Sequence, residues 1–105
     1  NGESTFSCAI AASSLVGKSI ITIEGVSESG TLSAIQKAFL TEIAAQCGYC
    51  TPGMIIATTA LFDKNPSPKK QDILKALQKH LCRCGSHARI LTAINNMQSD
   101  HPQND

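Results

Sequence analysis

The sequence predicts a mainly α-helical protein in which a four-helix unit follows a short β-containing segment. From residue 31 to residue 98, apolar side chains recur at three- and four-residue spacing, the period of helices packed on one face. Residues 1–30 lack that period and carry short runs of β-branched residues instead. We therefore expect a β-containing lead at 1–30, a helical domain at 31–98 and a flexible tail at 99–105.

Two short strands are expected in the lead. Residues 5–10 alternate between polar and apolar side chains, and residues 19–24 are rich in isoleucine and threonine. A loop through Gly17 joins them, and the Gly- and Ser-containing stretch 25–30 separates them from the helical part of the chain.

An apolar stripe predicts the first helix, and a start signal predicts the second. The stripe that ends near Gln46 consists of Leu32, Ile35, Phe39 and Ile43. Thr51 and Pro52 then supply a hydroxyl cap and a proline at the first helical position. This second helix is expected to stop near Asn65 and Pro66.

Ser67 and Pro68 repeat the same start signal for a third helix. Its buried face is predicted to be Ile73, Leu74, Leu77 and Leu81, with four lysines outside. A fourth helix is marked by Ile90, Leu91, Ile94 and Met97.

Four of the five cysteines form two tight pairs, each in a loop between consecutive helices: Cys47 with Cys50, and Cys82 with Cys84. In an antiparallel bundle the two loops can fall at the same end, so that four thiolates meet. Such a set suits a tetrahedral zinc ion or an iron–sulfur cluster, and the spacing alone does not separate them. A redox-active dithiol and a disulfide framework are weaker interpretations, since no βαβ pattern surrounds the pair and the cysteine count is odd.

Bulk properties exclude several functions. The net charge of +1 and the scarcity of aromatic residues argue against nucleic-acid binding. No apolar run reaches membrane-spanning length, so membrane insertion is not expected. We expect a cytoplasmic location, with periplasmic association as the alternative.

Two runs around the cysteine pairs resemble a known family. Residues 46–55 read QCGYCTPGMI, and residues 81–90 read LCRCGSHARI. Both are similar to the iron–sulfur subunit of the molybdenum hydroxylases, the family of xanthine dehydrogenase, aldehyde oxidoreductase and the isoquinoline and nicotinate oxidoreductases. Residues 32–39 and the helix break at 65–68 also look like that family, so the resemblance covers nearly the whole chain.

The resemblance implies a [2Fe-2S] cluster and an electron-transfer role without bond-making chemistry. Carried over by motif, the cluster ligands are Cys47, Cys50, Cys82 and Cys84. The partner it implies is a large subunit that holds molybdopterin, with Gln46 and Cys84 facing the pterin. A flavin or a cytochrome would be the further electron acceptor. The alternative function is a structural Cys₄ zinc module that acts in protein interaction.

Family members carry a preceding ferredoxin-like β-grasp domain with a second cluster, and residues 1–30 resemble its C-terminal remnant. Cys8 matches only the fourth ligand there, which suggests truncation and leaves Cys8 as a buried free thiol. His87 is not expected to be a ligand, because four cysteines satisfy the site. Residues 85–87, Gly-Ser-His in place of the Thr-Gly-Tyr of xanthine dehydrogenase, point to the isoquinoline and nicotinate branch. Arg83 is interpreted as a charge partner of the cluster rather than a plain surface cation.

Overall fold

A computed structural model describes residues 1–27 and 30–99 of the chain. Two 3-10 turns lie near the N-terminus, η1 (Ser7–Ala9) and η2 (Ala12–Leu15). After them come the α-helices α1 (Ile23–Val26), α2 (Ala34–Thr41), α3 (Thr51–Lys64), α4 (Lys70–Leu77) and α5 (His87–Ser99). The prediction of a mainly helical fold is confirmed.

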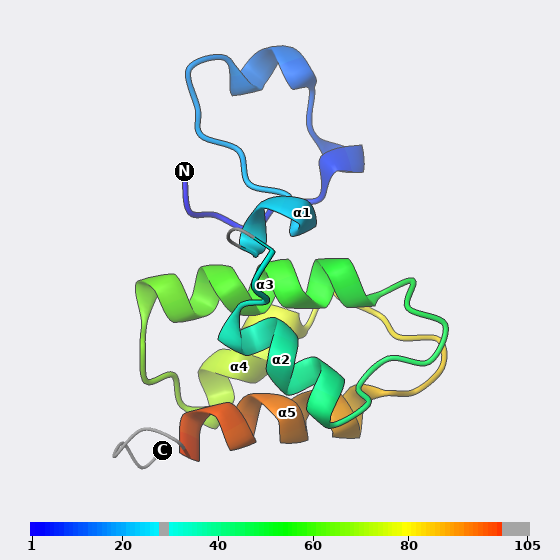
Figure 1. The fold of residues 1–105 in the computed structure, drawn as a ribbon. Coiled ribbons are helices and arrows are strands. Elements are labelled where there is room, and N and C mark those ends of the chain that lie inside the picture. The colour runs from blue at the N-terminus through cyan, green and yellow to red at the C-terminus, as the bar shows by residue number, and fades with distance from the viewer. Residues whose placement is uncertain (28–29, 100–105) are drawn as a thin grey trace.

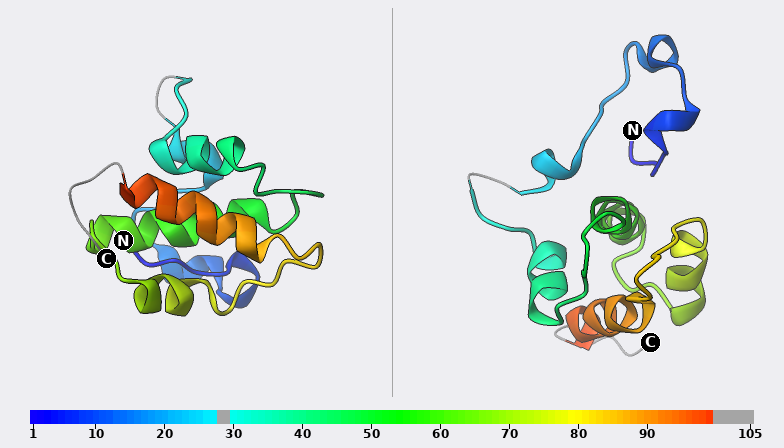
Figure 2. Two further views of the ribbon diagram at one scale, coloured as in Figure 1. Left: turned by 90° about the horizontal axis from the view of Figure 1, so that it is seen from below. Right: turned by 90° about the vertical axis from the view of Figure 1, so that its right-hand side faces the viewer.

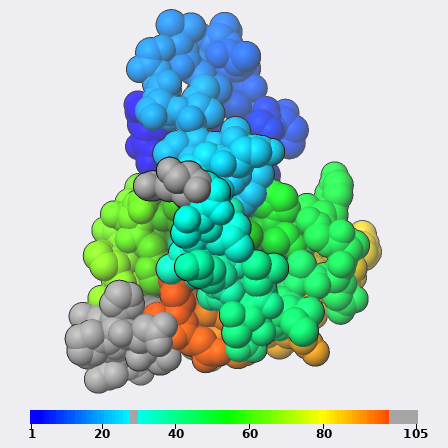
Figure 3. Space-filling model, in the orientation of Figure 1, coloured from blue at the N-terminus to red at the C-terminus, as the bar shows by residue number. Residues whose placement is uncertain are grey.

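The central element is α3, which contacts α1, α2 and α4, while α2 also packs along α5. In Figure 1, α2, α4 and α5 lie on one side of α3 and residues 1–22 extend from the other side. The right-hand view of Figure 2 shows the same arrangement, and Figure 3 shows the N-terminal segment projecting from the helical body. The helical part alone therefore forms the body that holds the cysteine loops.

One apolar core joins the predicted stripes. Its buried members include Ile35 and Phe39 from α2, Met54 and Ile55 from α3, Ile73 from α4, and Ile90 and Ile94 from α5. Burial of each such side chain stabilises the fold by about 1.5–3 kcal/mol. Cys82 belongs to the same buried cluster, so the core extends up to one of the cysteine loops.

The start of α2 shows why the sequence folds as it does locally. The Ser33 hydroxyl accepts a hydrogen bond from the backbone N–H of Gln36 at 3.2 Å. In return, the Gln36 side chain accepts from the Ser33 N–H at 2.8 Å, which completes a capping box. None of the described helices is long and apolar enough to cross a bilayer.

The two predicted strands are wrong. Residues 5–10 contain η1, and residues 19–24 run into α1, which starts at Ile23. Among residues 1–27 and 30–99 only Thr31 has a β-type bridge. An extended segment becomes a strand only when a partner strand satisfies its backbone groups, and local β-propensity does not supply that partner.

Three helix boundaries differ from the prediction. α2 ends at Thr41 instead of Gln46, and Ile43 takes a positive φ of 50° with 67 % of its surface exposed. Cys50, not Thr51, is the residue that precedes α3. α4 starts at Lys70, two residues later than the Ser-Pro signal, because the Asp72 carboxylate accepts from the Lys69 N–H at 3.1 Å.

Part of the predicted face of the third helix is also wrong. Leu74 is 45 % exposed and Leu81 is 70 % exposed, whereas Ile73 is buried. α4 ends at Leu77, so Leu81 lies in the following loop and cannot share its face. The predicted tail begins at Ser99, which is the last residue of α5, and its remaining positions, like residues 28–29, lie outside the described residues.

Candidate metal centre

The two cysteine loops meet at one end of the helical body. One loop connects α2 to α3 and the other connects α4 to α5, and both lie at the same end of α3 in Figure 1. The Gln46 side chain bridges them by donating from Nε2 to the carbonyl oxygen of Cys84 at 3.5 Å. Thus the two residues that the resemblance places toward a partner lie against each other, although 38 positions separate them.

The four thiols interact in pairs that cross from one loop to the other. Cys50 and Cys82 are close enough to shift each other's pKa, and Cys84 lowers the pKa of Cys47. Within the described part of the chain, no three His, Cys, Asp or Glu side chains converge tightly enough for a single ion. Four cysteines from two adjoining loops are the ligand number of a [2Fe-2S] cluster and of a structural zinc ion alike.

Cys82 forms hydrogen bonds with three consecutive residues, 85–87, at the end of the second loop and the start of α5. Its sulfur accepts from the Ser86 N–H at 3.3 Å, and its carbonyl oxygen accepts from the Gly85 N–H at 3.0 Å. Its own N–H donates to Nε2 of His87 at 3.3 Å. The Ser86 amide, followed by the Cys50 thiol, lowers the pKa of Cys82 to about 7 against the opposing effect of burial.

The first loop is more open. Cys47 is exposed, and its sulfur accepts from the Tyr49 N–H at 3.4 Å. This amide, helped by the Cys84 thiol, lowers the pKa of Cys47. Cys50 is half-buried, and desolvation together with its bond to Cys82 raises its pKa to about 11. The thiol groups therefore differ in acidity according to whether a neighbouring amide or burial dominates.

Glycine permits both amides to point at sulfur. Gly48 has a φ of 84° and Gly85 a φ of 78°, a region that residues with a Cβ rarely adopt. In each loop the glycine immediately precedes the residue whose N–H faces the thiol. Amides that stabilise a thiolate also stabilise the negative charge of a thiolate-bound cluster, so the donor set fits such a group.

The remaining candidates lie elsewhere. Cys8 is in η1 and is exposed, so the prediction that its thiol is buried is wrong, and it does not join the four paired thiols. Arg83 is exposed in the second loop, between Cys82 and Cys84, and its role as a charge partner of the cluster stays a prediction. His87 faces the backbone of Cys82 rather than the thiols.

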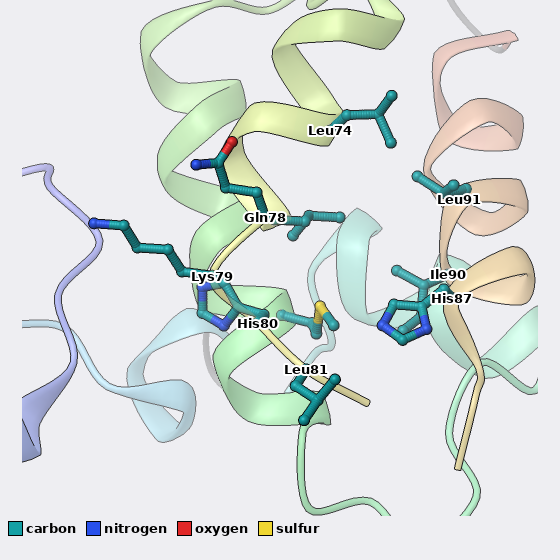
Figure 4. Close-up of a pocket in the computed structure, with 10 residues that line it drawn as sticks. Leu74, Gln78, Lys79, His80, Leu81, His87, Ile90 and Leu91 are labelled. Carbon is teal, nitrogen blue, oxygen red and sulfur yellow. The ribbon is translucent and has the colours of Figure 1, made fainter. Parts of the chain in front are cut away.

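Sequence reasoning missed two features beside the site. Ser86 is 2 % exposed and Thr51 is half-buried, and the hydroxyl oxygen of each is enclosed. An apolar cavity of about 430 Å³ also lies between α3, α4 and α5, and His87 forms part of its wall (Figure 4). The position of a serine directly after Cys-x-Cys-Gly was visible in the sequence, but its burial was not.

The comparisons identify the family. A family model described as a [2Fe-2S] binding domain matches residues 22–95. The chain is 45 % identical over 94 residues to the nicotinate dehydrogenase small FeS subunit of Eubacterium barkeri, covering 90 % of this chain and 60 % of that protein. It is also 39 % identical over 97 residues to the xanthine dehydrogenase iron-sulfur-binding subunit of Escherichia coli, covering 90 % of this chain and 60 % of that protein.

A solved structure gives the same result for the fold. The structure of quinoline 2-oxidoreductase from Pseudomonas putida 86 superposes with a TM-score of 0.71 at 34 % identity, covering 80 % of this chain and 52 % of that one. The chain thus spans about half to three-fifths of the length of these similar proteins. The paired thiols, the helical fold and the matching model agree, and the chain belongs to the [2Fe-2S]-binding domain family.

Proposed function

We propose that this chain is the electron-transfer part of a molybdenum hydroxylase and holds a [2Fe-2S] cluster through Cys47, Cys50, Cys82 and Cys84. The observation that carries the proposal is the meeting of the two cysteine loops at one end of α3, where Gln46 of the first donates to Cys84 of the second. The similar proteins support it, because they are named as small FeS or iron–sulfur-binding subunits of such dehydrogenases.

The proposed partner is a large molybdopterin-binding subunit. Exposed apolar side chains surround the cysteine loops and are the kind of surface that a partner covers: Leu40, Ile43, Tyr49 and Leu81 are each at least 66 % exposed. Gln46 lies between Ile43 and Tyr49 in the sequence and Cys84 lies three positions after Leu81; the two residues are joined by a hydrogen bond and are proposed to face the pterin.

In this proposal the partner performs the chemistry on the substrate, and this chain relays electrons one at a time to a flavin or a cytochrome. Its own residues keep the thiolates in place and supply amide hydrogen bonds to their sulfurs. We propose a cytoplasmic location, with periplasmic association as the alternative.

Residues 1–30 are proposed to belong to a second, preceding unit, with Cys8 as the fourth ligand of another cluster. The exposure of Cys8 and the projection of this segment from the helical body support a role outside the first site. The family model starts at residue 22, and α1 contacts α3, so the segment that contains α1 also packs on the helical unit.

Anaerobic reconstitution of the chain with iron and sulfide tests the proposal. We expect red-brown protein with about two irons and two sulfides per chain, and an EPR signal after reduction with dithionite. Cys8→Ser is the matched control and should retain both the metal content and the signal. Colourless protein that binds one zinc ion and no sulfide would instead favour the structural zinc module.

The partner is tested with Gln46→Ala in the assembled complex. The variant should slow electron transfer from the large subunit, because it removes the side chain that bridges the two loops at the proposed interface. Iron content and reduction potential of the isolated chain should stay unchanged, because Gln46 is exposed and is not a ligand. Unchanged transfer in the complex would contradict the interface assignment.

A further inference from the structure

Two enclosed hydroxyl oxygens in the described part of the chain have no hydrogen-bond partner: Oγ of Ser86 and Oγ1 of Thr51. A buried polar group without a partner is costly, and natural proteins rarely keep one without a reason. Ser86 lies two residues after Cys84, and Thr51 directly follows Cys50. Both residues are therefore within two positions of a cysteine of the site. No other enclosed side-chain nitrogen or oxygen atom of the described residues is without a hydrogen-bond partner.

Thr51 does not form the hydrogen bond that threonines in helices usually form. Helical threonines normally satisfy their hydroxyl by donating to the carbonyl oxygen four residues earlier. Four threonines of this chain do so at 2.8–3.0 Å: Thr41, Thr58, Thr59 and Thr92. Thr51 is the first residue of α3, so the carbonyl four positions earlier belongs to the cysteine loop and not to a helix.

Ser86 likewise departs from the usual role of its position. It directly precedes α5, and its carbonyl oxygen accepts from the Ile90 N–H at 3.0 Å. A serine at such a position normally turns its side chain toward a backbone N–H of the first helical turn. The Ser86 hydroxyl does not, and its oxygen is enclosed without a partner, although the N–H of the same residue donates to the sulfur of Cys82 at 3.3 Å.

The two residues are attached to the same side of the site. The Ser86 N–H reaches the sulfur of Cys82 at 3.3 Å, and Thr51 is covalently next to Cys50. The half of the site formed by Cys50 and Cys82 thus has two donors that nothing in the described part of the protein satisfies. The half formed by Cys47 and Cys84 is more exposed at Cys47.

We propose that the hydroxyls of Ser86 and Thr51 donate O–H···S hydrogen bonds to sulfur atoms on the Cys50–Cys82 side of the cluster and raise its reduction potential. The inference rests on the proposed [2Fe-2S] site. One-electron reduction adds one negative charge to the cluster, and donors aimed at its sulfurs favour the more negative state. Because the groups are enclosed, solvent does not screen this effect.

The test compares Ser86→Ala and Thr51→Val with Thr58→Val. Thr58 is a matched control, since it is 1 % exposed and lies in α3, but its hydroxyl already donates to Met54 at 2.8 Å. In a dithionite titration, the equilibrium constant for reduction should be about threefold to tenfold smaller in Ser86→Ala and in Thr51→Val than in the wild type. A tenfold fall lowers the reduction potential by ~59 mV for one electron. In the wild type the Fe–S stretching bands should shift in D₂O, and Ser86→Ala and Thr51→Val should each lose part of that shift. Thr58→Val should keep the wild-type reduction potential and the wild-type shift.

Each outcome decides between explanations. Unchanged potentials and D₂O shifts in both variants would show that the hydroxyls bond only to buried water and would overturn the inference. If Ser86→Ala does not retain the cluster, Ser86→Thr must restore cluster and potential together, and failure to do so also overturns it. If the wild-type chain itself binds no [2Fe-2S] cluster, the proposed function fails instead.

Discussion

The two cysteine loops perform the same task with different degrees of local support. In the second loop Cys82 is buried, and hydrogen bonds from within residues 82–87 fix its sulfur, carbonyl oxygen and N–H. In the first loop Cys47 is exposed and has one amide from Tyr49. The second loop is therefore a preformed half of the site, and the first is completed by its contacts with the second.

The difference follows from what surrounds each loop. Cys82 is part of the apolar core, so its side chain packs the second loop against the helices. The first loop follows the early end of α2 at Thr41 and the positive φ of Ile43, and it lies toward solvent. Such an open segment suits a surface that a partner covers, whereas the enclosed segment suits control of the cluster's surroundings.

The largest expected effect comes from replacing one ligand in each loop, Cys82→Ser and Cys47→Ser. Both variants should lose the cluster, with iron and sulfide falling at least about tenfold, because a two-iron cluster needs four thiolates. The unfolding of the metal-free chain in urea should then separate them. Only Cys82→Ser should lower the midpoint, because it places a hydroxyl in the core.

The corresponding control is Cys8→Ser, which changes an exposed thiol of η1 and should leave both measurements unchanged. Equal midpoints for Cys82→Ser and Cys47→Ser would contradict the distinction between a preformed and an open loop. Full cluster content in either ligand variant would contradict the ligand assignment itself.

An intermediate effect is expected for His87→Leu. The variant removes the acceptor of the Cys82 N–H and should lower the free energy of unfolding by about 1 kcal/mol, the net value of a typical hydrogen bond. The cluster should also be lost sooner to an iron chelator, because Cys82 is then held less firmly. His87→Gln retains an acceptor near the same place and should recover most of both properties. If Leu and Gln behave alike, the imidazole acts only by filling space beside the cavity.

Much of the fold was predictable because helical period and start signals are local. Of the predicted stripe, Ile35 and Phe39 are buried in α2, whereas Leu32 and Ile43 lie outside that helix and are exposed. The predicted stop of the second helix is confirmed, since α3 ends at Lys64, before the Asn-Pro pair. The strands at 5–10 and 19–24 are absent from the fold because a strand requires a distant partner, which propensity cannot reveal. Leu81 was misplaced because α4 stops at Leu77, which the apolar spacing does not show.

The candidate site divides in the same way. Cysteine spacing predicted two loops that can meet, and in the structure Gln46 of the first loop bonds to Cys84 of the second. The enclosure of Ser86 and the bond from Cys82 to His87 depend on how the second loop folds onto the core, and no spacing rule encodes that. The sequence thus predicted which cysteines form the site. The burial and the hydrogen bonds around them could be seen only in the structure.

The smallest effect on the isolated chain is expected for Tyr49→Ala in the open loop. Its side chain is 93 % exposed, and the bond to Cys47 comes from the backbone N–H, which alanine retains. The free energy of unfolding should change by no more than about 0.5 kcal/mol, and iron content should be normal.

The assembled complex should respond differently to the same change. A tyrosine buried at an interface often contributes about 2 kcal/mol or more, so removing Tyr49 should weaken association with the large subunit by roughly thirtyfold. Leu74→Ala, also on an exposed apolar residue but on α4 away from the open loop, is the control and should leave association unchanged. If Tyr49→Ala binds the large subunit like wild type, its exposure has another cause, and the open loop is not the surface that the partner covers.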